Sequence, residues 1–424
     1  MRSFDLAMSS NNIGTMKRKP GRVNRSGRGL RSGSGLSRLR RILPPRLRGD
    51  ESVESLVDDT FLAYNGARLR ESCQLLTKKV LRRDVVVGVS FAGALTPAGL
   101  GPSCFVPLIE AGFVDWMVTT GANLYHDLHF AFDYPLYAGS HRLDDAELHR
   151  QDIVRIYDVL LSLTDNLLPT DDRLKEVFRR PEFQKRMGTA ELHYLLGMVA
   201  DREERRHRRR GVSVLAAAYR AGVPIYVSAP GDSSLALNWV ESVMLGSRLV
   251  VDPTIDVNES AAIVWQAKQS GRKTAAVLIG GGSPKNFVLQ TEPQVQQILK
   301  LEQAGFDYFL QVTDARPDTG GLSGATPQEA VSWGKVDPEM LPDSVVCYLD
   351  TTVALPILTH YALARRRPRR LRRLYDRRER YSRALTATYR EFEQAVEQKS
   401  TPKARAEARA RAKRARGWRR TGKR

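Results

Sequence analysis

Lys335 is the side chain of this sequence with the strongest case for forming a covalent bond to a substrate. It lies in the stretch SGATPQEAVSWGKVDP, two residues after Trp333 and six after Glu329. Apolar neighbours disfavour the charged ammonium and lower the pKa of a lysine, and only the neutral amine attacks a carbonyl or imine. Composition alone favours the alternative, a surface lysine whose stem packs along apolar side chains.

Several turns rich in glycine and aspartate could bind a nucleotide. They are SFAGALTPAGLG, TTGAN, PGDSS, GGGSPKN, TDARPDTGG and LDTT. Glycine lets a phosphate approach the backbone, and aspartate can hold ribose hydroxyls. One such turn is weak evidence, and the strict GxGxxG pattern is absent. Together, at the carboxyl ends of strands, they indicate a nucleotide site at one edge of a sheet.

Short apolar runs predict the strands that must position these turns. The runs span residues 84–91, 115–120, 224–229, 247–252, 274–280, 307–313 and 344–350. Most are apolar throughout, which is typical of parallel strands buried on both faces. Helix-like segments lie at 102–112, 146–163, 211–221, 259–271, 287–304 and 326–333. The alternation predicts an α/β fold, a doubly wound, mainly parallel, Rossmann-like sheet with helices on both faces.

The positive charge is concentrated at the two ends of the chain. The 424 residues carry a formal net charge of +20, with +12 in residues 1–49 and +18 in residues 365–424, so that residues 50–364 carry −10. We expect a disordered basic tail at 1–49, a catalytic domain at 50–364 and an Arg-rich helix and tail at 365–424. We also expect both ends to be dispensable for turnover.

The remaining composition argues against several classes of protein. Three widely spaced cysteines fit a reducing compartment and give no zinc pattern. His126 and His129 are three residues apart, but a polar helix face explains them better than a metal site, so we expect no metal. No apolar run approaches the roughly 20 residues that span a bilayer. We therefore expect a soluble, cytoplasmic protein that does not bind membranes.

The segment GATPQEAVSWGK resembles the signature of the deoxyhypusine synthase family around its catalytic lysine. Further similar segments follow the family's order: FVDWMVTTGANLYHDL, PIYVSAPGDSSL, VLIGGGSPKN, DYFLQVTDARPDTGG and VVCYLDTTVALPIL. The resemblance covers roughly residues 51–364 and leaves out both basic ends. It is closest to the bacterial deoxyhypusine-synthase-like branch.

This resemblance implies an NAD-dependent transferase that moves the 4-aminobutyl group of spermidine through an imine on Lys335 to an acceptor lysine. It assigns Trp333 to the polyamine channel and Glu329 to a substrate amine. It also implies a homotetramer with active sites at subunit interfaces. The positions that it assigns to NAD are Gly93, Ala94, Thr120, Gly121, Asp232, Gly281, Asp314, Ala315, Asp350 and Thr351.

Most departures from the family pattern fall on the polyamine side. Asn286 replaces a histidine and His126 a glutamate, and both are still expected to contact substrate. Leu322 replaces an acidic residue, and Leu237 or Asn238 an aspartate. Lost carboxylates matter because the ammonium groups of a buried polyamine need acidic partners.

The altered contacts leave the acceptor open. One hypothesis is transfer to a protein lysine, and another is transfer to putrescine or another small amine, which would make homospermidine. A third hypothesis, from another class, is a nucleic-acid- or ribosome-associated protein that acts through its basic ends.

Overall fold

The computed structural model describes residues 41–400, with side chains up to residue 397. The chain divides by packing after Pro45, and the description below concerns the unit that begins at Arg46. Most of the predicted disordered segment 1–49 lies outside the described residues, and residues 41–49 are exposed and form no helix or strand. Within residues 41–400, no helix is both long enough and apolar enough to cross a membrane.

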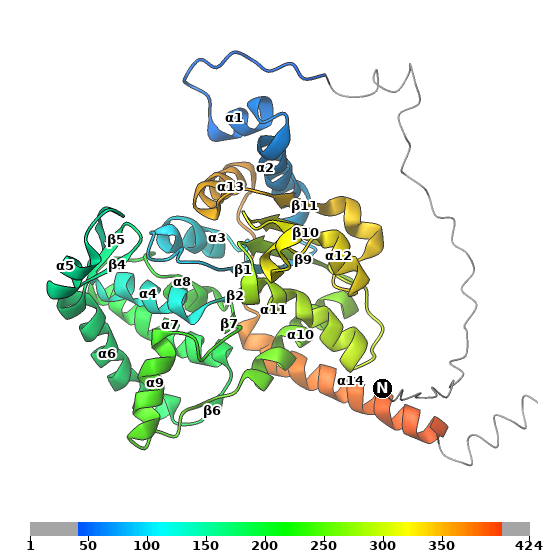
Figure 1. Ribbon diagram of the computed structural model, residues 1–424. Coiled ribbons are helices and arrows are strands. Elements are labelled where there is room, and N and C mark those ends of the chain that lie inside the picture. Colours follow the sequence, from blue (N-terminus) through cyan, green and yellow to red (C-terminus); the bar gives the residue numbers. More distant parts are fainter. Residues whose placement is uncertain (1–40, 401–424) are drawn as a thin grey trace, which may run out of the picture. The chain divides into compact units, whose positions relative to one another are not determined.

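Six parallel strands form the central sheet, in the order β11-β10-β9-β1-β2-β7. These strands are β1 (Val85–Phe91), β2 (Trp116–Thr119), β7 (Ile225–Val227), β9 (Lys273–Ile279), β10 (Tyr308–Val312) and β11 (Ser344–Cys347). The strand order runs in both directions from β1, as in a doubly wound sheet, and helices cover the sheet on both sides (Figure 1). The predicted fold class is confirmed.

The helices follow most of the predicted segments. They are α1 (Val53–Thr60), α2 (Tyr64–Leu75), α3 (Val106–Glu110), α4 (Gly121–Phe132), α5 (Asp145–Arg150), α6 (Leu168–Phe178), α7 (Thr189–Arg206), α8 (Val214–Ala221), α9 (Ser234–Met244), α10 (Pro253–Gln269), α11 (Gly282–Pro293), α12 (Pro327–Ser332), α13 (Thr351–Arg365) and α14 (Arg378–Ser400). Because the strands are parallel, the helices that follow β2, β7, β9 and β11 start at the same edge of the sheet.

The central strand β1 shows why its sequence is apolar throughout. Val87 and Val89 belong to one buried core, with side chains from α2, α3, α8 and α13. Val86 points into a second core, with side chains from α10, α11 and α14. Gly88 faces the same side as Val86, and a Cβ there would lie 2.5 Å from the indole of Trp116. A glycine is therefore required for this close approach between neighbouring strands.

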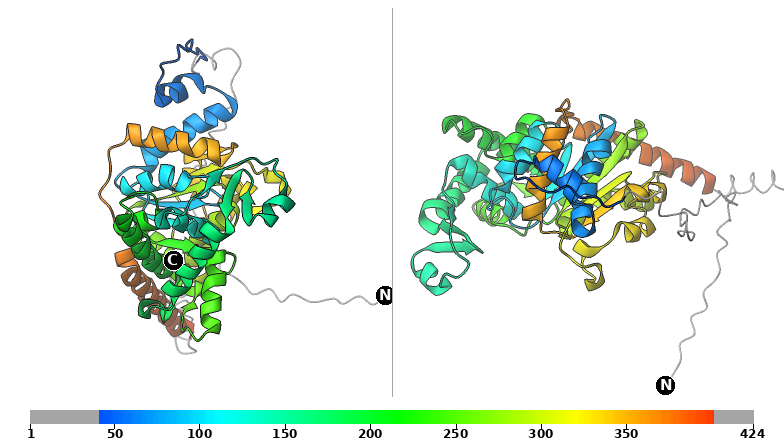
Figure 2. Two further views of the ribbon diagram at one scale, coloured as in Figure 1. Left: turned by 90° about the vertical axis from the view of Figure 1, so that its left-hand side faces the viewer. Right: turned by 90° about the horizontal axis from the view of Figure 1, so that it is seen from above.

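Two predicted elements differ in the structure. Residues 146–163, predicted to be helical, form α5 and an antiparallel pair, β4 (Ile153–Ile156) and β5 (Val159–Ser162), which β3 (Tyr137–Ala138) extends. Asp152 and Tyr157 both have φ of 55°, which interrupts a right-handed helix, and the β-branched residues around them favour strands. Figure 2 shows this small sheet at one end, away from the central strands.

The predicted strand 247–252 also lies outside the central sheet. Only Val250 and Val251 are extended, as β8, and they pair with β6 (Arg186–Met187). Val250 is 53% exposed, so this run lacks the cover on both faces that its apolar composition predicted.

The segment after α13 packs against the body instead of leaving it. Arg369 and Arg372 both form ion pairs with Asp115, at 3.4 and 3.1 Å. Helix α14 then packs against α10, and its Tyr381 and Leu385 are buried in the second core. The folded part therefore continues well past residue 364, where the charge change suggested a boundary.

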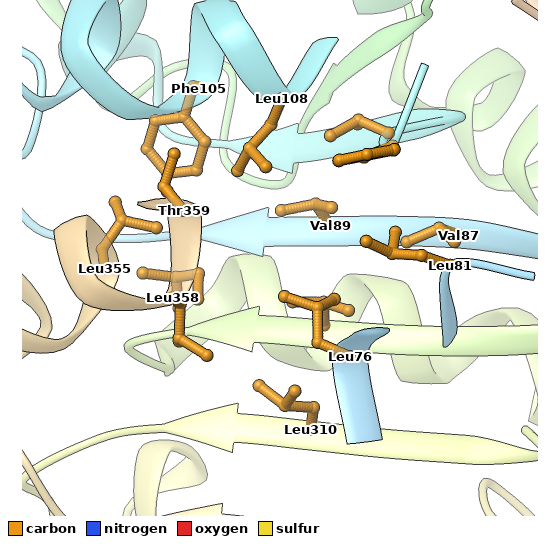
Figure 3. Close-up of a pocket in the computed structure, with 14 residues that line it drawn as sticks. Leu76, Leu81, Val87, Val89, Phe105, Leu108, Leu310, Leu355, Leu358 and Thr359 are labelled. Carbon is orange, nitrogen blue, oxygen red and sulfur yellow. The ribbon is translucent and has the colours of Figure 1, made fainter. Parts of the chain in front are cut away.

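The first core encloses a small apolar cavity between the sheet and α13, of about 30 Å³ (Figure 3). Leu355, Leu358 and Thr359 of α13 line it together with Val87 and Val89 of β1. The Thr359 hydroxyl is buried and has no hydrogen-bond partner among the described residues. Apart from Thr359, the residues that line this cavity are apolar side chains of the core, and none of the lining residues is titratable.

Candidate active site

Lys335 lies in a tight turn directly after α12. Its backbone N–H donates to Ala330 O at 3.0 Å, and its carbonyl accepts from Phe306 N at 2.9 Å, just before β10. Gly334 has a φ of 69°, and a Cβ there would lie 2.4 Å from Gln296 Oε1. The Gly-Lys pair therefore permits a turn that few other residues could make, and this turn sets the direction of the Lys335 side chain.

The Lys335 ammonium group points into a cavity of about 250 Å³ between α11 and α12. Its Nζ donates to Asn286 Oδ1 at 3.0 Å and lies 5.6 Å from the centroid of the Trp333 ring. Glu329 and Leu322 line the same cavity. Of the five residues predicted for the lysine and its substrate, four (Lys335, Asn286, Trp333 and Glu329) are thus brought together.

Burial lowers the pKa of Lys335 from its ordinary value, and the nearby Glu329 carboxylate partly opposes this effect. A lowered pKa increases the fraction of neutral amine near physiological pH, which is the nucleophilic form. The side chain of Trp333 is 55% exposed, so the cavity opens beside the indole instead of being sealed by it.

A second lysine in the cavity, Lys285, was not predicted from the sequence. It is only 2% exposed, and its Nζ donates to Gln311 Oε1 at 3.0 Å, Ser323 O at 3.3 Å and Ala325 O at 2.7 Å. Burial lowers its pKa to about 8, with Glu329 opposing and Lys335 adding to the effect. The signal in the sequence was its place next to Asn286 in GGGSPKN, which puts both residues on the first turns of α11.

Ser323 joins this cavity to the glycine turn after β9. The Gly282 N–H donates to Ser323 Oγ at 2.8 Å, and Gln311 Nε2 bridges Ser323 O at 2.8 Å and Gly280 O at 3.0 Å. A Cβ on Gly281 would lie 2.5 Å from Ser323, so the turn must contain glycine. The lysine cavity and one of the predicted cofactor turns are therefore neighbours.

The residues predicted for the cofactor follow six neighbouring parallel strands and so lie along the carboxyl edge of the sheet. They are Gly93 and Ala94 after β1, Thr120 and Gly121 after β2, Asp232 after β7, Gly281 after β9, Asp314 and Ala315 after β10, and Asp350 and Thr351 after β11.

Hydrogen bonds connect the turns at this edge. Asn123 Nδ2 donates to Gly93 O at 2.8 Å, which ties the turn after β1 to the start of α4. Thr120 caps α4 and Asp350 caps α13. The side chains of Asp232 and Asp314 are exposed. The edge thus combines helix N-termini, which favour anions, with free carboxylates.

His126 lies elsewhere, on α4, and does not line the Lys335 cavity. Its Nδ1 is 3.1 Å from His129 Nε2, and burial lowers its pKa to about 4. Asn238 is 5% exposed and donates to Asp171 Oδ1 at 2.7 Å, whereas Leu237 is 71% exposed. Within residues 41–400, no group of three or more His, Cys, Asp or Glu side chains is placed to hold a metal ion.

A family model and two related proteins match this chain, and all three belong to one family. The deoxyhypusine synthase family model matches residues 56–362. The chain is 55% identical over 339 residues to the "Deoxyhypusine synthase-like protein" of Nostoc punctiforme, covering 80% of this chain and 87% of that one. It is 36% identical over 312 residues to "Probable deoxyhypusine synthase 2" of Methanosarcina acetivorans, covering 73% and 86%.

A crystallised Entamoeba histolytica protein, assigned as a deoxyhypusine synthase, superposes with a TM-score of 0.49 at 14% identity, covering 76% of this chain and 96% of that one.

Proposed function

Because this chain belongs to the deoxyhypusine synthase family, we propose that it is an NAD-dependent aminobutyl transferase that uses Lys335 as its nucleophile. One observation carries the proposal: Lys335 Nζ lies in a cavity, hydrogen-bonded to Asn286 at 3.0 Å, with its pKa lowered by burial. A lysine kept partly neutral beside a carboxylate that can bind an ammonium group is suited to forming an imine with a polyamine.

The carboxyl edge of the sheet fits NAD. Helices α4, α9, α11 and α13 begin there, and their backbone N–H groups could hold the pyrophosphate. Gly93 has a φ of 79° and no atom within 4 Å of its Cβ position, which leaves room for a ligand against the backbone. The carboxylates of Asp232, Asp314 and Asp350 would accept hydrogen bonds from ribose hydroxyls. Bound NAD would supply one hydride acceptor and later return the same hydride.

In this proposal the residues of the cavity bind the aminobutyl group and transfer it. After oxidation of the bond between the secondary nitrogen of spermidine and its butyl carbon, the neutral Nζ of Lys335 adds to that carbon. The three-carbon diamine leaves with the nitrogen electron pair and a proton, and the aminobutyl group remains as an imine on Lys335. Glu329 would hold the free ammonium end, with the indole of Trp333 alongside. The acceptor amine then displaces Lys335, and the new imine is reduced.

Lys285 would act on this chemistry through its charge. Three oxygen acceptors fix its ammonium group within the cavity. Positive charges on Lys285 and Lys335 disfavour each other, an effect that contributes to the lowered pKa of Lys285. In this proposal the same repulsion would favour the neutral form of Lys335. Lys285 is therefore a positioning and electrostatic residue in this proposal.

A small amine as acceptor is the second candidate, because the cavity departs from the family pattern at residues expected to contact the polyamine, and this leaves the acceptor open. Glu329 is the one carboxylate among the lining residues, and Asn286 and Leu322 occupy positions where the resemblance led us to expect a histidine and an acidic residue. We propose a homotetramer for either acceptor, by analogy with the family.

The test is an assay with NAD and spermidine, followed by borohydride trapping of the enzyme adduct. We expect wild-type protein to gain the mass of an aminobutyl group on Lys335 and K335A to show no adduct. An undiminished adduct in K335A would disprove the role of Lys335. If the enzyme with NAD, spermidine and putrescine forms homospermidine when no acceptor protein is added, a protein acceptor is not required.

A further inference from the structure

A groove rich in arginine lies at the amino edge of the sheet, opposite the edge that we assign to the cofactor. It consists of two adjoining cavities, of about 490 and 380 Å³, which share Arg272 and Arg377. Arg83 and Arg370 line the first cavity, and Arg380 lines the second. No carboxylate is among the residues that line either cavity.

Two buried arginines of the C-terminal segment build this groove. Arg369 donates to Gly112 O at 2.8 Å and to Arg82 O at 3.1 Å, and Arg372 donates to Val85 O at 2.9 Å, so the segment is fixed to the residues just before β1 and β2. Both also pair with Asp115, which neutralises only one of the two charges. The segment therefore brings Arg370 and Arg377 to the loops that carry Arg83 and Arg272.

Four arginines that line the groove have no ionic partner among the residues whose side chains the structure describes, unlike Arg369 and Arg372, which pair with Asp115. Arg83, Arg272, Arg370 and Arg377 are all exposed, and none of them forms an ion pair among residues 41–397. Nearby carboxylates are already engaged, since Asp84 pairs with Arg82, and Asp376 with Arg373. Four guanidinium groups from three parts of the chain thus converge on one concave surface without counter-charges.

We propose that this groove binds the phosphodiester backbone of a single nucleic-acid strand. Guanidinium groups bind phosphate oxygens in a bidentate manner, and a concave basic surface concentrates anions. The groove extends over two cavities, which favours a chain of phosphates over one isolated phosphate. Leu371, Tyr381 and Ala384 line it as well and give an apolar floor for sugars or bases.

The position of the groove makes this binding independent of the proposed reaction. Arg83 and Arg272 immediately precede the segments that enter β1 and β9, whereas Gly93 and Gly281 follow these strands. A bound strand would therefore lie at the end of the sheet away from the cofactor turns. Loss of aminobutyl transfer would not affect this proposal, and loss of strand binding would not affect the proposed reaction.

The test compares two triple variants of the full-length chain. R272Q/R370Q/R377Q removes three groove charges, and R142Q/R179Q/R248Q removes three exposed charges that lie outside the groove and have no ion pair among the described residues. Residues 1–49 and 401–424, which carry much of the remaining positive charge, are the same in both variants. Fluorescence anisotropy of labelled polyuridine and polythymidine, in several lengths up to about 20 nucleotides, is measured over a range of KCl concentrations.

We expect the groove variant to weaken binding about tenfold or more at low salt and to reduce the slope of log K against log[salt] by about 2, since each phosphate contact on a single strand contributes about 0.7. The control variant should change affinity by about twofold at most, because charges outside the groove act only at long range. R272K/R370K/R377K should keep most of the slope, because it preserves the charges.

Three results would overturn the proposal. Equal losses in the groove and control variants would show a general charge effect. Affinity that does not rise with oligonucleotide length would show a site for a single phosphate. Equally tight binding of polyglutamate of the same charge, with the same loss in the groove variant, would assign the groove to acidic protein segments instead.

Discussion

The ion pairs that fix the C-terminal segment give the sharpest stability prediction. The side chains of Asp115 and Arg369 are 3% and 6% exposed, and that of Arg372 is 14% exposed. D115N removes the negative charge but keeps an oxygen that can accept from Val87 N, as Asp115 Oδ2 now does at 2.8 Å. The variant therefore isolates the loss of charge from the loss of a backbone hydrogen bond.

The expected cost follows from the two buried charges that remain. Removing one partner of a buried ion pair costs about 3–5 kcal/mol, because the other charge stays desolvated without compensation. Backbone carbonyls still accept from both guanidinium groups, so we expect the lower end, about 3 kcal/mol. That is a large part of the roughly 5–15 kcal/mol that stabilises a folded domain.

Urea unfolding and hydrogen exchange together measure this effect. D115N should lower the free energy of unfolding by about 3 kcal/mol, or expose the amides of α14 to exchange about 100-fold more often if the segment detaches alone. D376N is the matched control, because the Asp376–Arg373 pair is 43–44% exposed and should contribute about 1 kcal/mol or less. If the two variants cost the same, the buried pairs do not hold the segment, and the reasoning is wrong.

Three further predictions concern the Lys335 cavity, the first core and helix α14. E329Q should move the acid limb of the pH profile for adduct formation on Lys335 to lower pH. The reason is that Glu329 raises the pKa of that lysine, so its removal leaves more neutral amine at a given pH. Single-turnover rates of adduct formation at saturating spermidine, recorded over a range of pH, measure the shift. L358A should cost about 2–5 kcal/mol in urea unfolding, because Leu358 is 3% exposed and its removal enlarges an existing cavity. A chain ending at residue 400 should keep its thermal unfolding temperature, whereas one ending at 364 should lose α14 and aggregate, as size-exclusion chromatography would show.

The two substitutions each have a control variant on the same element or nearby, and the chain ending at 400 is the control for the chain ending at 364. E339Q removes a carboxylate that does not line the cavity and should leave the pH profile in place. V353A changes a residue of α13 that is 54% exposed and should cost about 0.5 kcal/mol or less. The argument for Glu329 is wrong if the acid limb of the pH profile moves to higher pH in E329Q. The argument for the core is wrong if L358A and V353A lower the free energy of unfolding equally. The argument for α14 is wrong if the chain ending at 364 is soluble and stable.

The sequence predicted the central sheet because its signal is local. A run such as 85–91 is apolar on both faces only if both faces are covered, and the structure buries alternate residues of β1 in two cores. It failed for 146–163, where a short mixture of apolar and charged residues fits a helix or a hairpin equally well, and the left-handed φ of Asp152 and Tyr157 decided the outcome.

In the candidate site, too, some residues could be placed from the local sequence and others only from the structure. Glu329, Trp333 and Lys335 lie within seven consecutive residues, so their sequence alone was enough to place them together. Asn286 and Lys285 reach the same cavity from α11, about 50 residues away, and the resemblance suggested only the first of them. The role of Lys285 depends on burial by residues distant in sequence, which no local pattern encodes.

The sequence by itself determined the alternation of strands and helices, the glycine turns at one edge of the sheet and the lysine with its nearest neighbours. Only the tertiary structure decided which charges are buried and which are free. By composition, residues 365–400 are a basic end like any other, but Asp115 and α10 fix Arg369, Arg372 and Arg378 to the body and leave Arg370 and Arg377 facing a groove. The physical reason is that an ion pair depends on distance and desolvation in space, and neither can be read from the order of residues along the chain.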